Sequence, residues 1–283
     1  MVEPNKVLDF IAHLILTLGV LVIVFPIYLA LVASTHSALE MSQNPVPLWF
    51  GGEGFGNFHA VLLGDETNFA SRLQVSKMLW VSFVMAMGIA LGKIVISLMS
   101  AFAIVYFRFP FRKLVFWGIF FTLMLPVEVR IVPTYKVIAD LGLVNTYTGL
   151  ILPLTASATA TFLFRQFFLT LPDELTEAAK MDGASPGRFL WHILLPLSKT
   201  SIAALFVIQF IYGWNQYLWP LLISTDEHMY PIVMGIRNLS AGADTEITWN
   251  LVMACAILAM LPPAIVVVLM QKWFVKGLVD TEK

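Results

Sequence analysis

A single lysine interrupts a long apolar stretch of the chain. Lys93 lies within the run from Leu79 to Phe107, roughly 14 residues or about 21 Å along a helix from its start. A charge at that depth is too far from water to reach it easily, so the side chain should face the protein interior. Two interpretations stay open: Lys93 attracts an anionic substrate, or it pairs structurally with a carboxylate or with carbonyl groups at a helix end.

A second pair of charges follows another apolar run. Glu128 and Arg130 lie between Pro126 and Pro133, where the prolines should loosen a helix. The two side chains either line or gate the outer mouth of a transmembrane path, or they form an interfacial ion pair that contributes little energy.

A polar aromatic cluster lies inside the apolar run from Ser201 to Ile223. It consists of Trp214, Asn215, Gln216 and Tyr217. Amide side chains at membrane depth rarely face lipid. We therefore expect the cluster to line a translocation path, with hydrogen bonding between helices as the alternative.

The sequence offers no constellation typical of catalysis or metal binding. Its five histidines are scattered, and Cys255, the single cysteine, can form neither an internal disulfide nor a thiolate metal site. The stretch from Gly88 to Ile94 is similar to a phosphate loop, but Met87 and Ile94 stand where glycine and serine or threonine are required. We predict no catalytic residue, no metal site and no cofactor bound by this chain.

The elements that position these residues are predicted to be transmembrane helices. Charged residues make up 12% of the chain and hydrophobic residues 59%, whereas a soluble domain carries about a quarter charged residues. Crossing a bilayer takes roughly 20 apolar residues in a helix. The fold class is therefore all-α and integral to the membrane, with six predicted spans: Phe10–Val32, Leu79–Phe107, Leu114–Pro133, Thr148–Phe168, Ser201–Ile223 and Leu251–Met270.

Charge asymmetry predicts the orientation. Basic residues concentrate in cytoplasmic segments, and placing both termini in the cytoplasm puts more than twice as many of them inside as outside. The inside set is Lys6, Arg108, Arg112, Lys113, Arg165, Lys180, Arg188, Lys199, Lys272, Lys276 and Lys283, and the outside set is Arg72, Lys77, Arg130, Lys136 and Arg237. The net charge is −1 without basic clusters, so no nucleic-acid partner is expected.

The longest predicted cytoplasmic segment, from Leu169 to Phe189, should form two short helices. Thr170 is a candidate N-cap for the first helix, and Gly183 should end it. Ser185, followed by proline, should begin the second.

One face of the first short helix is suited to contact with another protein. Leu175, Ala178, Ala179 and Asp182 share that face. Because these side chains are small or short, the surface should be nearly flat and allow a partner to approach closely.

The same segment resembles a known family. Glu177-Ala178-Ala179, Gly183 and Ile193-Leu194-Leu195-Pro196 reproduce the E-A-A-x-x-x-G-x₉-I-x-L-P signature of binding-protein-dependent ABC importer permeases. The resemblance implies a type I importer fold with a coupling helix, within the loop 169–196, seated in a cleft of a separate ATPase. Glu177 would make polar contacts there, the two alanines would permit close packing, and Gly183 would set the turn.

The resemblance extends over about residues 77–277, and this part of the chain is similar to the maltose-type sugar permeases. It rests on Ala101–Ile104, Leu141–Thr146 and Trp214–Pro220, and residues 123–130 and 157–168 resemble permeases for sn-glycerol-3-phosphate. The predicted external loop, 37–76, departs from the pattern. We divide the chain into an N-terminal helix and external loop (1–76), the importer transmembrane domain (77–277) and a cytoplasmic tail (278–283).

The resemblance also implies partners. They are a homologous permease subunit forming a heterodimer, two ATPase subunits that use ATP and Mg, an external solute-binding protein, and the bilayer of a bacterial inner membrane. The implied cargo is sn-glycerol-3-phosphate or related glycerophosphodiesters, with a neutral sugar or oligosaccharide as the alternative. A secondary transporter without an ATPase, the alternative of another class, would need internal inverted repeats, and the sequence shows none that is convincing.

Overall fold

The computed structural model describes residues 6–42, 47–64, 74–122, 127–240 and 248–279, and regular structure in these ranges is helical throughout. The chain folds as two compact units. The first contains Met1–Lys77 and Gly235–Leu261, and the second contains Met78–Met234 and Pro262–Lys283. The division of the sequence into three regions stays a prediction.

The first unit is built around one long apolar helix. It contains α1 (Lys6–Ala33), α2 (Ala38–Ser42), α3 (Gly54–Leu63) and the first part of α16 (Trp249–Val279). Most side chains of α1 are exposed although they are apolar, which is typical of a helix that faces lipid. Asn57 donates hydrogen bonds to the carbonyl groups of Ser34 and His36 and accepts one from Asn250 at 3.1 Å. These bonds tie α3 to α16 and to the end of α1.

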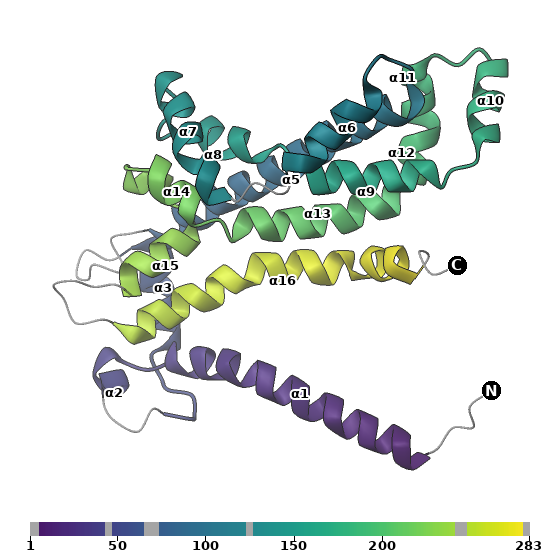
Figure 1. Ribbon diagram of the computed structural model, residues 1–283. Helices are drawn as coiled ribbons and strands as arrows, with labels where there is room; N and C mark the ends of the chain where they lie inside the picture. Colours follow the sequence, from purple (N-terminus) through teal and green to yellow (C-terminus); the bar gives the residue numbers. More distant parts are fainter. Residues whose placement is uncertain (1–5, 43–46, 65–73, 123–126, 241–247, 280–283) are drawn as a thin grey trace. The chain divides into compact units, whose positions relative to one another are not determined.

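The second unit contains most of the remaining helices (Figure 1). They are α5 (Val75–Tyr106), α6 (Arg112–Phe121), α7 (Val127–Asp140), α8 (Tyr147–Ile151), α9 (Ala158–Leu169), α10 (Asp173–Met181), α11 (Pro186–Phe189), α12 (Leu195–Leu197), α13 (Lys199–Trp214) and α14 (Leu218–Ile223). A core cluster joins α5, α9 and α13 through residues such as Phe102, Phe164 and Leu205. The short helix α15 (Ile232–Ser240) lies across the boundary between the units.

Glycines allow the helices of the second unit to pack closely. A Cβ added at Gly88 would lie 2.7 Å from the Ile151 side chain, and one at Gly92 would lie 2.6 Å from that of Thr155. A Cβ at Gly213 would lie 2.9 Å from the Cα of Ala86. The segment that is similar to a phosphate loop is therefore a small-residue contact surface between helices.

The described helices agree with only part of the predicted span count. Three are long and apolar enough to cross a membrane, and two bent pairs raise the number to five if each pair is one span. The predicted fourth span contains a 50° bend before α9, where Ser157 caps the new helix by accepting a hydrogen bond from the Ala160 amide. The predicted third span covers most of α6 and the first half of α7, with residues 123–126 between them outside the described part. Six spans stay a prediction.

Candidate coupling and translocation site

The predicted coupling segment forms a short helix at one end of the second unit. Figure 1 shows α10 beyond the end of α9 and connected to α11. The prediction that Thr170 caps α10 is wrong, because the Thr170 hydroxyl donates to the Phe167 carbonyl at 2.7 Å and closes α9 instead. Pro172 disfavours a helical conformation at the residue before it, so α10 begins only at Asp173.

The end of α10 agrees with the prediction made from Gly183. This glycine has a φ of 68°, in the left-handed region. Its N–H donates to the Lys180 carbonyl at 3.1 Å, and the N–H of Ala184 donates to the Ala179 carbonyl at 2.9 Å. This pair of bonds is a Schellman motif. Ser185 then accepts a hydrogen bond from the Arg188 amide at 3.3 Å and begins α11, as predicted.

The three residues of the Glu-Ala-Ala motif face different directions. Ala179 is 5% exposed and packs in the core cluster of α5, α9 and α13, whereas Glu177 and Ala178 are exposed. Met181, on the same helix, is 85% exposed. The predicted flat face is therefore divided: successive residues on a helix are about 100° apart, so Ala179 packs against this chain and Ala178 faces outward.

Aromatic contacts connect the predicted coupling segment to the long helices. The ring of Tyr106, at the end of α5, lies 5.2 Å from that of Phe189 and 5.9 Å from that of Phe168, measured between centroids. After α11 the chain continues through a π-helical turn, η3 (Leu190–Leu194), and α12 before it bends by 74° into α13. The segment is therefore in contact with the ends of α5 and α9 and is joined to α13 through α12.

Lys93 lies in a buried polar contact between α5 and α13. Its Nζ donates to the Gln209 Oε1 at 3.0 Å and lies 3.5 Å from the centroid of the Tyr212 ring. Lys93 and Gln209 are each 6% exposed. Within the described part of the chain no carboxylate oxygen lies within 4.0 Å of this ammonium group, so its two neighbours are both uncharged. Among the described residues the contacts of Lys93 are therefore an amide and an aromatic ring, and both interpretations of this lysine stay predictions.

Gln209 is a polar residue that sequence reasoning missed. It lies three residues before Tyr212, so both side chains share one face of α13, and that spacing in an otherwise apolar run was a usable signal.

The polar aromatic cluster lies where the predicted fifth span is broken. Helix α13 ends at Trp214, which is buried, and α14 begins at Leu218. Between them the chain is not helical, and Gln216 donates through Nε2 to the Tyr212 carbonyl at 3.1 Å. The prediction of one continuous helix is wrong here. Non-helical backbone at membrane depth is tolerated where it is buried in protein or lines a cavity.

The remaining predicted site residues lie on α7. Arg130 is exposed, and the Glu128 side chain is outside the described part, so a gate or ion pair at these residues stays a prediction. Among the described residues no group of three or more His, Cys, Asp or Glu side chains is arranged to hold a metal ion.

Comparison with known proteins identifies the family. Residues 93–280 match the family described as binding-protein-dependent transport system inner membrane component. A protein of Brucella melitensis biotype 1 named sn-glycerol-3-phosphate transport system permease protein UgpE is 58% identical over 283 residues, covering 100% of both chains. Proteins of the same name from Rhizobium meliloti and Pectobacterium atrosepticum are 58% and 56% identical over the same length.

A solved structure shares the fold. It is a crystal structure of a bacterial ABC transporter involved in the import of the acidic polysaccharide alginate, and it matches with a TM-score of 0.78 at 21% identity, over 97% of this chain and 99% of that one. The resemblance based on the Glu-Ala-Ala-Gly signature is thereby confirmed. This chain belongs to the binding-protein-dependent transport system inner membrane components, the permease subunits of ABC importers.

Proposed function

We propose that this chain is one of two homologous permease subunits of an ATP-driven importer for sn-glycerol-3-phosphate. The observation that carries the proposal is full-length identity of 58% to permeases named for that substrate. The chain spans the bacterial inner membrane with both termini in the cytoplasm. It works with two ATPase subunits, which bind the ATP and Mg, and with an external solute-binding protein.

The exposed face of α10 docks on the ATPase. Glu177 and Ala178 are exposed and supply the polar and close contacts, while Ala179 anchors α10 to this chain and Gly183 fixes where the helix ends. This division of roles is supported by the opposite burial of the two alanines. A helix attached on one face and open on the other can transmit a force between two proteins.

Transport follows from that attachment. ATP binding closes the ATPase pair and moves the two coupling helices, and the packing of Tyr106 against Phe168 and Phe189 transmits the movement to α5 and α9. The membrane path then opens outward to receive cargo. Lys93 and the segment Trp214–Tyr217 line that path, with Lys93 attracting the phosphate group.

The test reconstitutes the complete importer in vesicles with labelled sn-glycerol-3-phosphate and the solute-binding protein. Uptake should require ATP and the ATPase subunits, and excess neutral maltodextrin should not compete. Uptake by this chain without any ATPase would contradict the importer mechanism. Competition by the neutral sugar would assign the permease to the alternative cargo.

The docking face is tested with Ala178→Trp, which places a bulky side chain on the exposed side of α10. The ATPase subunits should no longer co-purify, and uptake should fall at least about tenfold, equivalent to the loss of roughly 1.4 kcal/mol of docking energy. The control is Ala38→Trp, at an exposed position in the predicted external loop. Equal ATPase recovery in both variants would reject α10 as the docking element.

A further inference from the structure

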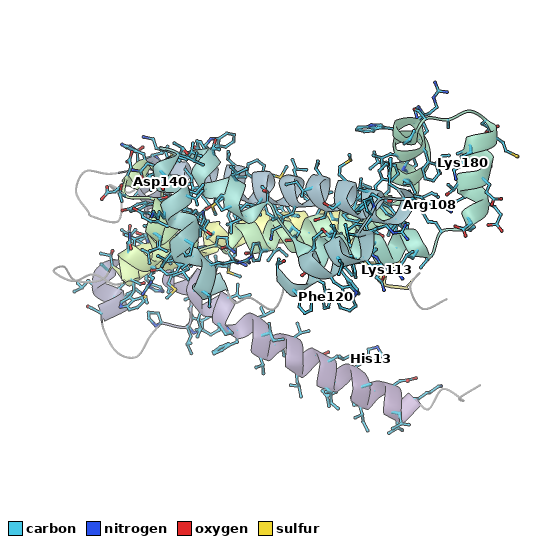
Figure 2. All side chains as sticks on the ribbon, turned by 45° about the horizontal axis from the view of Figure 1, so that its top comes forward. His13, Arg108, Lys113, Phe120, Asp140 and Lys180 are labelled. Atoms are coloured by element: carbon cyan, nitrogen blue, oxygen red, sulfur yellow. The ribbon has the colours of Figure 1, made fainter. Side chains whose placement is uncertain are left out.

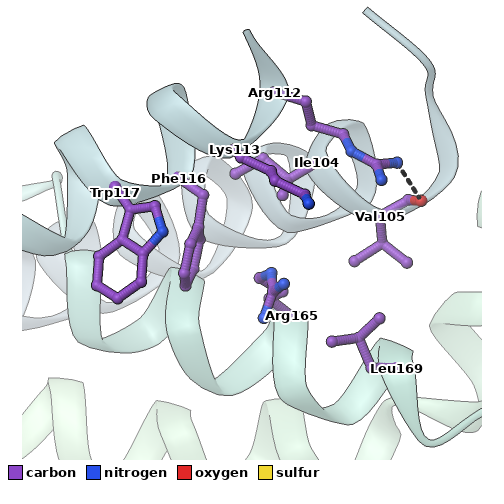
Figure 3. Close-up of a pocket in the computed structure, with 8 residues that line it drawn as sticks. All are labelled: Ile104, Val105, Arg112, Lys113, Phe116, Trp117, Arg165 and Leu169. Atoms are coloured by element: carbon purple, nitrogen blue, oxygen red, sulfur yellow. Dashed lines mark hydrogen bonds between the residues drawn. The ribbon is translucent and has the colours of Figure 1, made fainter.

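A pocket lined by basic and aromatic side chains lies between α5, α6 and α9, on the side of the unit that carries α10. Its volume is about 380 Å³, and Figure 3 shows Arg112, Lys113 and Arg165 around it together with Phe116 and Trp117. Figure 2 shows Lys113 and Arg108 at the same end of the second unit as Lys180 of α10, with Asp140 at the opposite end. The pocket is distinct from the buried contact of Lys93 and from the exposed face of α10.

The three cations of this pocket have no neutralising carboxylate in the described part of the chain. Within the described residues no carboxylate oxygen lies within 4.0 Å of any of them. Arg112 donates to the carbonyl groups of Val105 and Phe107, both at 3.4 Å. The Nε–H of Arg165 is buried and has no acceptor among the described residues. A buried donor without a partner is unfavourable, and an anionic ligand would supply the missing acceptor.

The start of α6 adds to the positive potential. The positive end of a helix favours anions, yet the first turn of α6 contains Arg112 and Lys113 and no acidic residue. No side chain caps this end, because the N-cap residue is Phe111, whose side chain has no hydrogen-bonding atom. Two cations beside a positive helix end repel it, and a bound anion would reverse that unfavourable arrangement.

The rest of the pocket is apolar, which selects among anions. The Arg165 guanidinium lies 4.2 Å from the centroid of the Phe116 ring, and Trp117 and Leu169 complete the lining. Trp side chains are enriched at membrane interfaces, and basic pockets between helices on the cytoplasmic side bind lipid headgroups. We propose that this α5–α6–α9 pocket binds a phosphate group, and that an anionic membrane phospholipid supplies it.

The experiment measures lipid binding by the assembled importer in phosphatidylcholine nanodiscs that contain increasing amounts of phosphatidylglycerol. Retained phosphatidylglycerol is counted by native mass spectrometry. Lys113→Gln should weaken retention about fivefold, and the double variant Arg112→Gln/Lys113→Gln roughly 25-fold, as expected for about 1 kcal/mol per basic residue near a lipid headgroup. Arg165→Lys, which keeps the charge but removes the buried Nε–H, should weaken retention to a smaller extent.

Lys199→Gln is the matched control, because Lys199 is an exposed cation on the predicted cytoplasmic side and outside the pocket. It should bind phosphatidylglycerol as the unmodified protein does. Each variant is also checked for an unchanged melting temperature in phosphatidylcholine alone. Equal retention in the double variant and in the Lys199→Gln control would overturn the proposal, as would an absence of preference for phosphatidylglycerol.

A second arm distinguishes the source of the phosphate. Inorganic phosphate and sn-glycerol-3-phosphate are added in turn to the phosphatidylglycerol nanodiscs at millimolar concentration. Neither should displace the lipid, because neither fills the apolar part of the pocket. Displacement that depends on Arg112 and Lys113 would support the phosphate site and overturn the assignment of a lipid to it.

Discussion

At the scale of single residues, Lys93 is a buried cation with no carboxylate beside it among the described residues. Its described neighbours are the Gln209 amide and the Tyr212 ring. Both interact favourably with a cation, but neither cancels the charge. A buried cation without a counter-ion is costly, and such residues inside a membrane mark substrate paths by default. On the proposed function, an anionic substrate in the path would supply the negative charge that the described residues around Lys93 do not.

The predicted role of Lys93 is tested by comparing two variants of the same contact. Lys93→Gln removes the charge, and Gln209→Leu removes the hydrogen bond while keeping the charge. Lys93→Gln should lower uptake of sn-glycerol-3-phosphate by about tenfold or more, since a charge-assisted contact is worth roughly 1.5–3 kcal/mol, while ATPase recovery stays normal. Gln209→Leu should have a much smaller effect on the apparent substrate affinity. Similar losses in both variants, with reduced thermal stability, would mean that Lys93 is structural.

Two substitutions of Gly183 distinguish the effect of its backbone conformation from the effect of side-chain size. Nothing lies within 4 Å of a Cβ added there, but the φ of 68° strains any residue with a side chain. Gly183→Ala should cost about 1 kcal/mol and lower the ATP-driven uptake roughly fivefold by loosening the end of α10. Gly183→Asn should retain more uptake, because asparagine tolerates the left-handed region better. If both variants behave alike, the turn conformation is not what matters.

At the scale of elements, the sequence predicted the apolar helices well and their interruptions poorly. The boundaries of α1, α5 and α16 follow from long apolar runs, since a helix is the simplest way to satisfy the backbone in lipid. The break between α13 and α14 was not predicted, because polar residues such as Asn215 and Gln216 inside an apolar run occur both in continuous helices and in interrupted ones. The direction of Ala179 was likewise inaccessible, since it depends on which neighbours pack against α10.

The contacts of Asn145, in the loop before α8, could not be predicted from the sequence either. Asn145 was noted only as part of a family pattern, but it connects the turn before α8 to the segment after α14. Its Oδ1 accepts hydrogen bonds from the amides of Thr225 and Asp226, and its Nδ2 donates to the Thr225 hydroxyl at 2.8 Å. Its φ of 56° is one that asparagine tolerates. The sequence marks the residue, but its partners lie about 80 positions away and only folding brings them together.

The segment after α1 should be stabilised by a histidine in a pH-dependent manner. His36 lies 2.9 Å from the Glu40 carboxylate and 2.8 Å from the Trp49 carbonyl, one through each ring nitrogen. Both neighbours are acceptors, so the doubly protonated ring satisfies both. The hydrogen bond to Trp49 is the main reason that the pKa of His36 is raised above its ordinary value of 6.5, and bonds from Ser37 and His36 lower the pKa of Glu40.

The sign of the pH effect follows from these two directions. Because its pKa is raised on folding, His36 stabilises the folded segment fully below pH 6.5. This stabilisation is lost as the pH rises through the pKa that His36 has in the folded protein. Because its pKa is lowered on folding, Glu40 stabilises the folded segment fully above pH 4.5. This stabilisation is lost as the pH falls through the pKa that Glu40 has in the folded protein. Protease cleavage after α1 should therefore be slowest between these limits and faster at about pH 8.5. His36→Gln should remove the increase on the alkaline side, and an unchanged profile in that variant would exclude His36 as its cause.

At the scale of the whole molecule, the importer mechanism depends on the orientation of the chain in the membrane. α10 can meet an ATPase only if it lies in the cytoplasm, where ATP is available. The charge asymmetry predicts this orientation, and it also places the α5–α6–α9 pocket at the cytoplasmic interface. An inverted chain would expose α10 to the outside and remove the basis of both proposals.

The chain contains a single cysteine, which makes its orientation measurable. Cys255 is buried, so the unmodified protein gives a low background with a membrane-impermeant thiol reagent. Gly52 and Gly187 each have no atom within 4 Å of an added Cβ, so cysteine fits at both positions without displacing neighbours. Gly52→Cys, in the predicted external loop, should react in intact spheroplasts. Gly187→Cys, in α11 directly after the turn that ends α10, should react only after the membrane is permeabilised, because charged reagents do not cross the hydrocarbon core. The reverse labelling pattern would place α10 outside, where no ATPase driven by cytoplasmic ATP can reach it.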